Sequence, residues 1–133
     1  MQKGFGSAPK KKFQKDSRYL KFYNEEKYAA DLLRNKKIKE AKNLYLKLLK
    51  SKYQSYEIFF NLGFIEKNQN NYKEAIKYLT KAKTLNKKNN LNLIFGLVNS
   101  YISLKDIKEA RLLMDEAIKN NPKSDLLLSL IHI

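Results

Sequence analysis

The stretch that decides the fold is "LGFIEKNQNNYKEAIKYLTKA", residues 62–82. On both sides of a polar segment, residues 68–71, its apolar residues recur at intervals of three and four. This spacing is typical of amphipathic helices, and the polar segment is typical of a loop that ends one helix and precedes the next. We therefore expect two helices joined by a short turn.

A motif within this stretch occurs three times along the chain. "IKEA" stands at residues 38–41 and 107–110, and "YKEA" at residues 72–75. The last alanines of the three motifs are separated by 34 and then 35 residues. A fixed period of about 20–50 residues is typical of stacked supersecondary units, each too small to bury its own apolar face. Outside the middle unit, equivalent helix pairs are expected at about 21–34 with 37–50 and at 91–104 with 107–120.

The middle unit resembles a tetratricopeptide repeat, through an aromatic residue, a Leu-Gly pair, a second aromatic residue and small residues in the second helix. The matching residues are Phe59, Leu62, Gly63, Tyr72, Ala75, Leu79 and Ala82 in the middle unit; Leu97, Tyr101, Ala110, Met114, Ala117 and Pro122 in the third; and Ala29, Leu32, Ala41 and Tyr45 in the first. Val98 and Ala29 replace the usual glycine, and Lys87 and Tyr53 replace a frequent proline. The resemblance covers roughly residues 21–127.

The resemblance implies an all-α fold, a right-handed α-solenoid of antiparallel helix pairs. We expect the solenoid at residues 18–127, with repeats at about 21–54, 56–89 and 91–124. Glycine inside a helix costs about 1 kcal/mol relative to alanine, so Gly63 makes sense where two helix backbones come close. The residues expected to be structural are Leu62, Gly63, Tyr72, Ala75, Ala82, Tyr101, Ala110, Ala117 and Pro122.

Function in this family is usually carried by the concave face, which the resemblance assigns to the first helix of each pair. The peptide-binding residues expected there are Phe60, Asn61, Phe64, Lys67, Phe95 and Asn99. The phenylalanines offer apolar anchors, and the asparagines offer a donor and an acceptor to the backbone of an extended peptide. In the alternative interpretation, the phenylalanines belong to the core between neighbouring repeats. We expect a non-enzymatic scaffold that binds a peptide or protein segment.

Some family members bind the terminal carboxylate of a chaperone through a set of Lys, Arg and Asn residues. Of the corresponding positions here, only Asn61 matches. Glu26, Asn92 and Gly96 stand where basic residues are expected, and Ala30 stands in place of an asparagine. The pattern therefore argues against a chaperone-tail ligand.

Nucleic-acid binding is the second hypothesis, because the net charge is +15. Residues 1–18 contribute +5 of this charge, and residues 1–17 are expected to be a disordered basic tail. The remaining lysines occur on both helices of each unit without an evident single stripe. A third hypothesis comes from the "KGFG" start, which resembles bacterial repeat proteins that carry a transferase domain after the repeats; the chain would then be the accessory part of a truncated transferase.

Catalytic motifs are missing from the sequence. It has no cysteine and a single histidine, His132, and it contains no HExxH, GxSxG or Gly-rich phosphate loop. We therefore expect no enzymatic activity, no metal site and no cofactor. No apolar run approaches the roughly 20 residues that span a bilayer, and we expect a cytoplasmic protein without a membrane span.

The last six residues, "LSLIHI" at 128–133, allow two interpretations. They match the translation of the mosaic end used in transposase-based sequencing adapters, which would make them an artefact. Otherwise they belong to the first helix of a fourth repeat.

Overall fold

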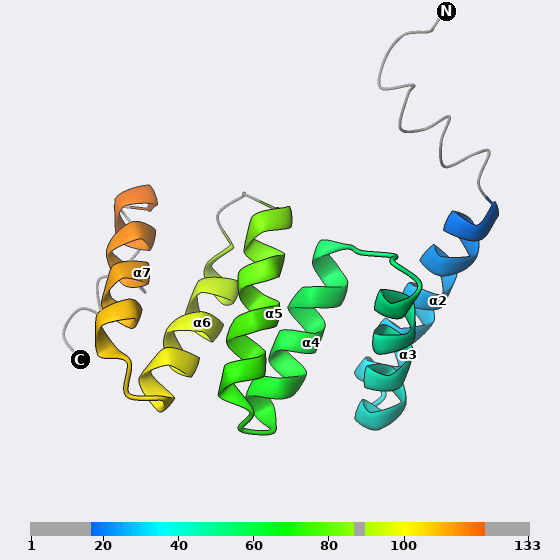
Figure 1. Ribbon diagram of the computed structural model, residues 1–133, viewed down its shortest axis with the longest axis horizontal. Helices are drawn as coiled ribbons and strands as arrows, with labels where there is room; N and C mark the ends of the chain where they lie inside the picture. Colours follow the sequence, from blue (N-terminus) through cyan, green and yellow to red (C-terminus); the bar gives the residue numbers. More distant parts are fainter. Residues whose placement is uncertain (1–16, 87–89, 122–133) are drawn as a thin grey trace, which may run out of the picture. The chain divides into compact units, whose positions relative to one another are not determined.

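The computed structural model describes residues 17–86 and 90–121, and all regular secondary structure within these ranges is α-helical (Figure 1). The helices are α2 (Ser17–Arg34), α3 (Ile38–Lys50), α4 (Tyr56–Asn68), α5 (Tyr72–Leu85), α6 (Leu91–Ser103) and α7 (Ile107–Asn120). The predicted all-α fold of paired helices is confirmed. Pro122, nearly all of the predicted basic tail and residues 128–133 lie outside the described residues.

The chain divides into two compact units, with the boundary between Gln54 and Ser55. The first unit contains α2 and α3, which pack against each other, and the second contains α4 to α7. In the second unit α5 packs against both α4 and α6, and α7 packs against α6 (Figure 1). Each helix pair is therefore a hairpin whose members run in opposite directions.

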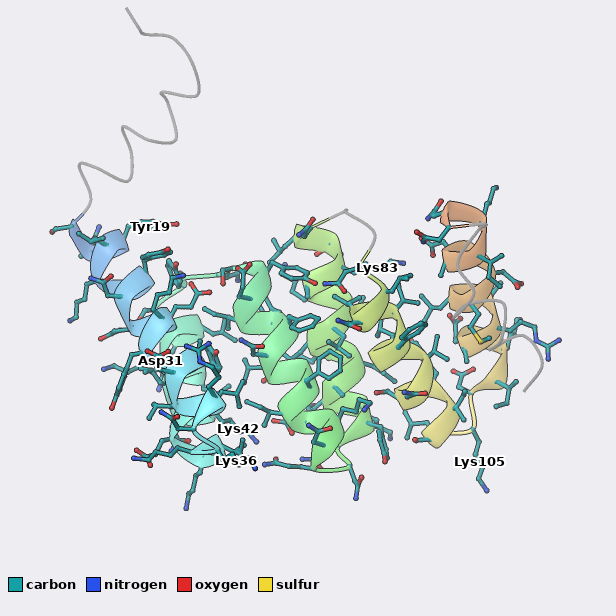
Figure 2. The ribbon with its side chains drawn as sticks, turned by 180° about the vertical axis from the view of Figure 1, so that it is seen from behind. Tyr19, Asp31, Lys36, Lys42, Lys83 and Lys105 are labelled. Carbon is teal, nitrogen blue, oxygen red and sulfur yellow. The ribbon has the colours of Figure 1, made fainter. Side chains whose placement is uncertain are left out.

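The same turn joins the two helices of every pair. A residue in the left-handed conformation follows each first helix: Lys36 at φ 64°, Asn70 at φ 65° and Lys105 at φ 63°. In the middle turn, the amide of Asn71 donates to the carbonyl of Glu66 at 2.8 Å, and the amide of Asn70 donates to that of Lys67 at 3.0 Å. This is the Schellman pattern, and the other two turns repeat it. Lys36 and Lys105 are labelled at their turns in Figure 2.

Tyr53, just beyond the end of α3, completes the core of the first unit. Its ring lies 5.4 Å from that of Tyr19 and 5.6 Å from that of Phe22, both on α2. Its hydroxyl donates a hydrogen bond of 2.9 Å to the Glu26 carboxylate. The contact with Tyr19 gives a reason for α2 to begin at Ser17, four residues before the expected start, because it holds the first turn of the helix against the core.

The core of the second unit is built around a fully buried leucine, Leu79 of α5. A Cβ atom added to Gly63 of α4 would lie 2.5 Å from both Cγ and Cδ2 of Leu79. One added to Gly96 of α6 would lie 3.1 Å from Cδ1 of the same residue. The two glycines therefore let α4 and α6 approach α5 from two sides. Other buried apolar residues are Ile58, Phe59, Leu62, Ile65, Ala75, Ala82, Leu93, Ile94, Leu97, Val98, Ala110 and Ala117.

Candidate functional site

A shallow cavity of about 260 Å³ lies in the second unit, lined by residues of α4 and α6. These are the first helices of two successive pairs. Its lining residues are Phe60, Phe64, Lys67, Asn92, Phe95, Gly96 and Asn99. Side chains one helical turn apart face the same way, which explains the spacing of the two lining sets along α4 and α6. The cavity is smaller than the roughly 300–1,000 Å³ of most small-molecule sites, so its size suits one or two side chains of a ligand.

Aromatic rings follow one another along α4 at intervals of four residues. The rings of Tyr56 and Phe60 are stacked with centroids 5.5 Å apart, and those of Phe60 and Phe64 are tilted with centroids 4.8 Å apart. Pairs in these ranges contribute about 0.5–1.5 kcal/mol beyond area burial. The row therefore holds Phe60 and Phe64 in place at the cavity while both rings stay partly exposed.

Gly96 makes room for the end of this aromatic row. A Cβ atom at this position would lie 2.8 Å from Cζ of Phe64 and 3.3 Å from its Cε1. The outer end of the Phe64 ring therefore lies against the backbone of α6, and Phe64 also lines the cavity. Phe64 therefore packs between neighbouring repeats and also lines the candidate site, and its role in peptide binding stays a prediction.

Polar groups stand around the apolar floor of the cavity. Asn92 and Asn99 are exposed on α6. The Lys67 ammonium lies 5.7 Å from the centroid of the Phe64 ring, which is cation–π distance. Among the described lining residues there is one cation and no carboxylate, so the electrostatics of the cavity favour an anionic or neutral ligand.

Tyr56, at the start of the aromatic row, connects α4 to the beginning of α6. Its hydroxyl accepts a hydrogen bond from the side-chain amide of Asn90, the residue that caps α6 by accepting from the Leu93 amide. Burial is the main cause that raises the pKa of the Tyr56 hydroxyl, with a further increase from the charge of Glu57 and a decrease from Asn90. The tyrosine is therefore neutral across the physiological range and serves as a structural link.

Five of the six predicted peptide-binding residues line this cavity: Phe60, Phe64, Lys67, Phe95 and Asn99. The sixth, Asn61, is half-buried, has a partner of its own and is not among the lining residues. Sequence reasoning did not assign Asn92 and Gly96 to the peptide site, although both lie on the face of α6 that carries Phe95 and Asn99. Asn92 lies three residues before Phe95 and Gly96 lies three residues before Asn99, and this helical spacing was the available signal.

The residues predicted to be structural differ in burial. Fully or almost fully buried are Leu62, Gly63, Ala75, Ala82, Ala110 and Ala117. Tyr72 and Tyr101 are partly exposed, and the Tyr72 hydroxyl donates to the side-chain oxygen of Asn70 at 2.9 Å. Sequence reasoning missed Glu66, which is 4% exposed and accepts a hydrogen bond of 2.8 Å from the Asn71 side chain. This bond links the end of α4 to the start of α5.

Within residues 17–86 and 90–121, no group of three or more His, Cys, Asp or Glu residues could hold a metal ion. None of the helices in the described part of the chain is long and apolar enough to cross a membrane.

Comparison with known proteins agrees with the repeated helix pairs. A family model described as tetratricopeptide repeat matches residues 67–131, which is 65 of the 133 residues. Over residues 67–131 the chain is similar to tetratricopeptide repeats. This match confirms the resemblance inferred from the sequence, and repeats of this family generally mediate protein–protein interactions and are typically non-catalytic. No curated protein matches the chain.

Proposed function

We propose that this tetratricopeptide repeat chain binds a peptide segment of another protein in the cavity between α4 and α6. The observation that carries the proposal is the convergence of Phe60, Phe64 and Phe95 on one cavity with exposed amide side chains beside them. Such a site holds an apolar side chain of the ligand on the phenylalanines. The asparagines hydrogen-bond the ligand backbone, which has unpaired donors and acceptors in an extended peptide.

Charge narrows the class of peptide. Lys67 is the charged residue among the described lining residues, and the chain as a whole carries +15. A ligand with an apolar residue next to an aspartate or glutamate places its apolar part over the rings and its carboxylate near the Lys67 ammonium. A basic peptide would be repelled, so acidic–apolar segments are the preferred ligands.

A displayed library of random peptides provides the probe for this proposal. Peptides enriched on the full chain are synthesised, and their dissociation constants are measured by fluorescence anisotropy. We expect the double variant Phe60→Ala with Asn99→Ala to weaken binding by about tenfold to a hundredfold, because truncating an aromatic anchor that the bound peptide covers removes a binding hot spot. Circular dichroism checks that the helices are kept.

The matched control is Leu112→Ala with Asn120→Ala, which changes one apolar residue and one asparagine, both exposed on α7. This variant should bind the selected peptides as the parent chain does. Equal affinity of the parent and the Phe60/Asn99 variant would remove the cavity from peptide binding.

A second candidate function is binding of a nucleic-acid backbone, supported by the lysines of α5. Lys73, Lys77 and Lys81 are all exposed and follow at intervals of four, so they form one row on the surface of the helix. Such a row offers several cations to successive phosphates, and binding of this kind weakens steeply with salt. Anisotropy with labelled single-stranded RNA at two salt concentrations tests it. Binding that is equally strong after all three lysines are changed to glutamine would reject this site.

A further inference from the structure

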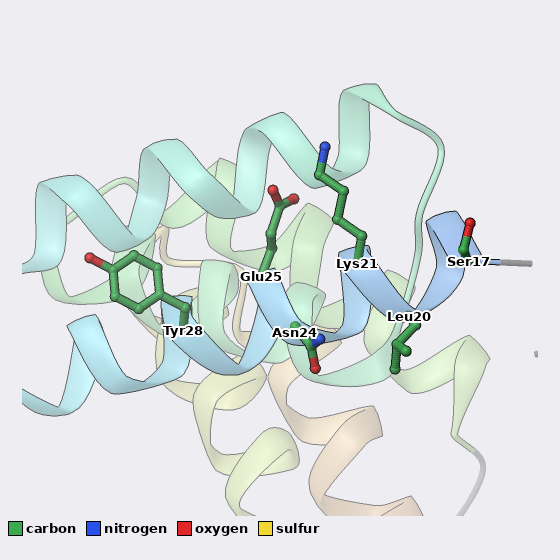
Figure 3. Close-up of a pocket in the computed structure, with 6 residues that line it drawn as sticks. All are labelled: Ser17, Leu20, Lys21, Asn24, Glu25 and Tyr28. Atoms are coloured by element: carbon green, nitrogen blue, oxygen red, sulfur yellow. The ribbon is translucent and has the colours of Figure 1, made fainter.

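A second surface feature lies in the first unit, on the face of α2 that carries its exposed apolar side chains. Leu20 is 56% exposed and Tyr28 is 58% exposed, whereas Ala29 and Leu32 of the same helix are buried. A groove of about 450 Å³ runs along this face (Figure 3). Its lining residues are Ser17, Leu20, Lys21, Asn24, Glu25 and Tyr28.

These six residues form two rows in which members are four positions apart. One row is Ser17, Lys21 and Glu25, and the other is Leu20, Asn24 and Tyr28. Figure 3 shows Lys21 and Glu25 leaving α2 on one side, and Leu20 and Asn24 leaving it on the other. Rows at this interval are the ridges by which helices pack, and the groove between two ridges accepts a ridge of another helix. The surface therefore has the form of one half of a helix–helix contact.

We propose that this face of α2 pairs with the same face of a second copy of the chain, with the two helices antiparallel about a two-fold axis near Tyr23 and Asn24. About this two-fold axis, each row of one copy faces the same row of the second copy, with its residues in reverse order. With a rise of about 1.5 Å per residue, Lys21 then lies opposite Glu25 of the second copy. Leu20 in turn approaches Tyr28 of the second copy, so that the exposed apolar side chains cover one another.

Charge is the reason for choosing a second copy as the occupant. The six lining residues carry one positive and one negative charge, so the groove is neutral in a chain with a net charge of +15. A strongly acidic partner would leave Glu25 opposed by like charge, and a strongly basic partner would do the same to Lys21. A two-fold contact pairs both charges at once, because the same surface appears on each side.

The expected dimer is weak. One helix from each copy buries less than the roughly 1,200 Å² at the lower end of stable interfaces, so we expect a dissociation constant in the micromolar range or above. The high positive charge of both copies also opposes association, and salt near about 0.15 M screens this repulsion. The contact therefore forms reversibly and depends on protein concentration.

Sedimentation equilibrium of the full chain, from about 1 µM to about 1 mM, tests the proposal. We expect Lys21→Glu and Glu25→Lys each to raise the dissociation constant of the dimer by roughly threefold to thirtyfold, because the two-fold axis makes two weak ion pairs and each variant loses both. The double variant with both residues exchanged restores the pairs and should dimerise as the parent chain does.

The variant Leu20→Lys tests whether the exposed apolar side chains of the two copies cover one another, and it should leave no measurable dimer. Its matched control is Leu112→Lys on α7, where the leucine is 53% exposed and lies in the other unit. A parent chain that stays monomeric throughout this range overturns the proposal, and would leave another partner or another part of the chain as the cover of α2. A dimer that survives Leu20→Lys but not Leu112→Lys overturns it as well.

Discussion

Replacing Gly63 with alanine tests whether the close contact between α4 and α5 sets the spacing within a repeat. The new Cβ atom would lie 2.5 Å from two side-chain atoms of Leu79. Carbon atoms pack at about 3.5–4.0 Å, so the two groups must separate by about 1 Å. Leu79 is fully buried, and the surrounding core leaves it little room to move.

The magnitude follows from two opposing effects. Overpacking a core by one methyl group costs about 1–3 kcal/mol, and the severe overlap here puts the cost in the upper half of that range. Alanine gains about 1 kcal/mol over glycine in helix propensity. We therefore expect Gly63→Ala to lower the free energy of unfolding by about 1–2 kcal/mol, measured by urea titration followed by circular dichroism.

Two further variants separate the clash from other causes. Leu79→Ala removes both overlapping atoms, so adding Gly63→Ala in that background should raise the free energy of unfolding by up to about 1 kcal/mol. Gly96→Ala meets chiefly the outer end of the partly exposed Phe64 ring, at 2.8 Å, and should cost less than Gly63→Ala. A Gly63→Ala chain as stable as the parent would show that α4 and α5 are not held at this spacing by the glycine.

The remaining predictions concern a turn and a buried tyrosine. Lys105→Gly should raise the free energy of unfolding, measured by urea titration, by about 0.5–1 kcal/mol, because the relief of left-handed strain outweighs the entropy cost of glycine. The control Lys108→Gly changes a lysine that is also exposed but helical, and it should lower the free energy of unfolding by up to about 1 kcal/mol. Tyr53→Phe should lower it by about 1–2 kcal/mol at pH 7, because the Glu26 carboxylate loses a donor. Burial, followed by the hydrogen bond and charge of Glu26, raises the pKa of Tyr53 above its usual value of 10.0, so the unfolded chain releases this proton first as the pH rises and stability falls. The phenylalanine variant lacks this loss, and urea titrations across alkaline pH should show the two stabilities converging above pH 10; a constant difference would contradict the assignment.

The fold was predictable because its signal is repeated along the sequence. The alanines of the "KEA" motifs recur at 34 and 35 residues, and Ala41, Ala75 and Ala110 are all buried in the structure. The start of α2 was less predictable, because its first turn packs against Tyr53, more than thirty residues away in the chain. A local pattern contains no information about such a contact.

The candidate site was predictable where it depends on one helix. The spacing of Phe60 and Phe64 places both rings on one face of α4, and the structure puts both at the cavity. The contribution of Gly96 depends on how closely α6 approaches α4, which the sequence of α6 alone does not show. Whether the cavity binds a peptide stays a prediction.

The side chain of Leu79 packs against two glycines. One of its methyl groups lies near Gly63 in its own helix pair, and the other lies near Gly96 in the next helix pair. A single side chain thus joins two neighbouring repeats. Loosening it would disturb both contacts together, so the α4–α5 and α6–α7 hairpins should melt in one cooperative step and not one after the other.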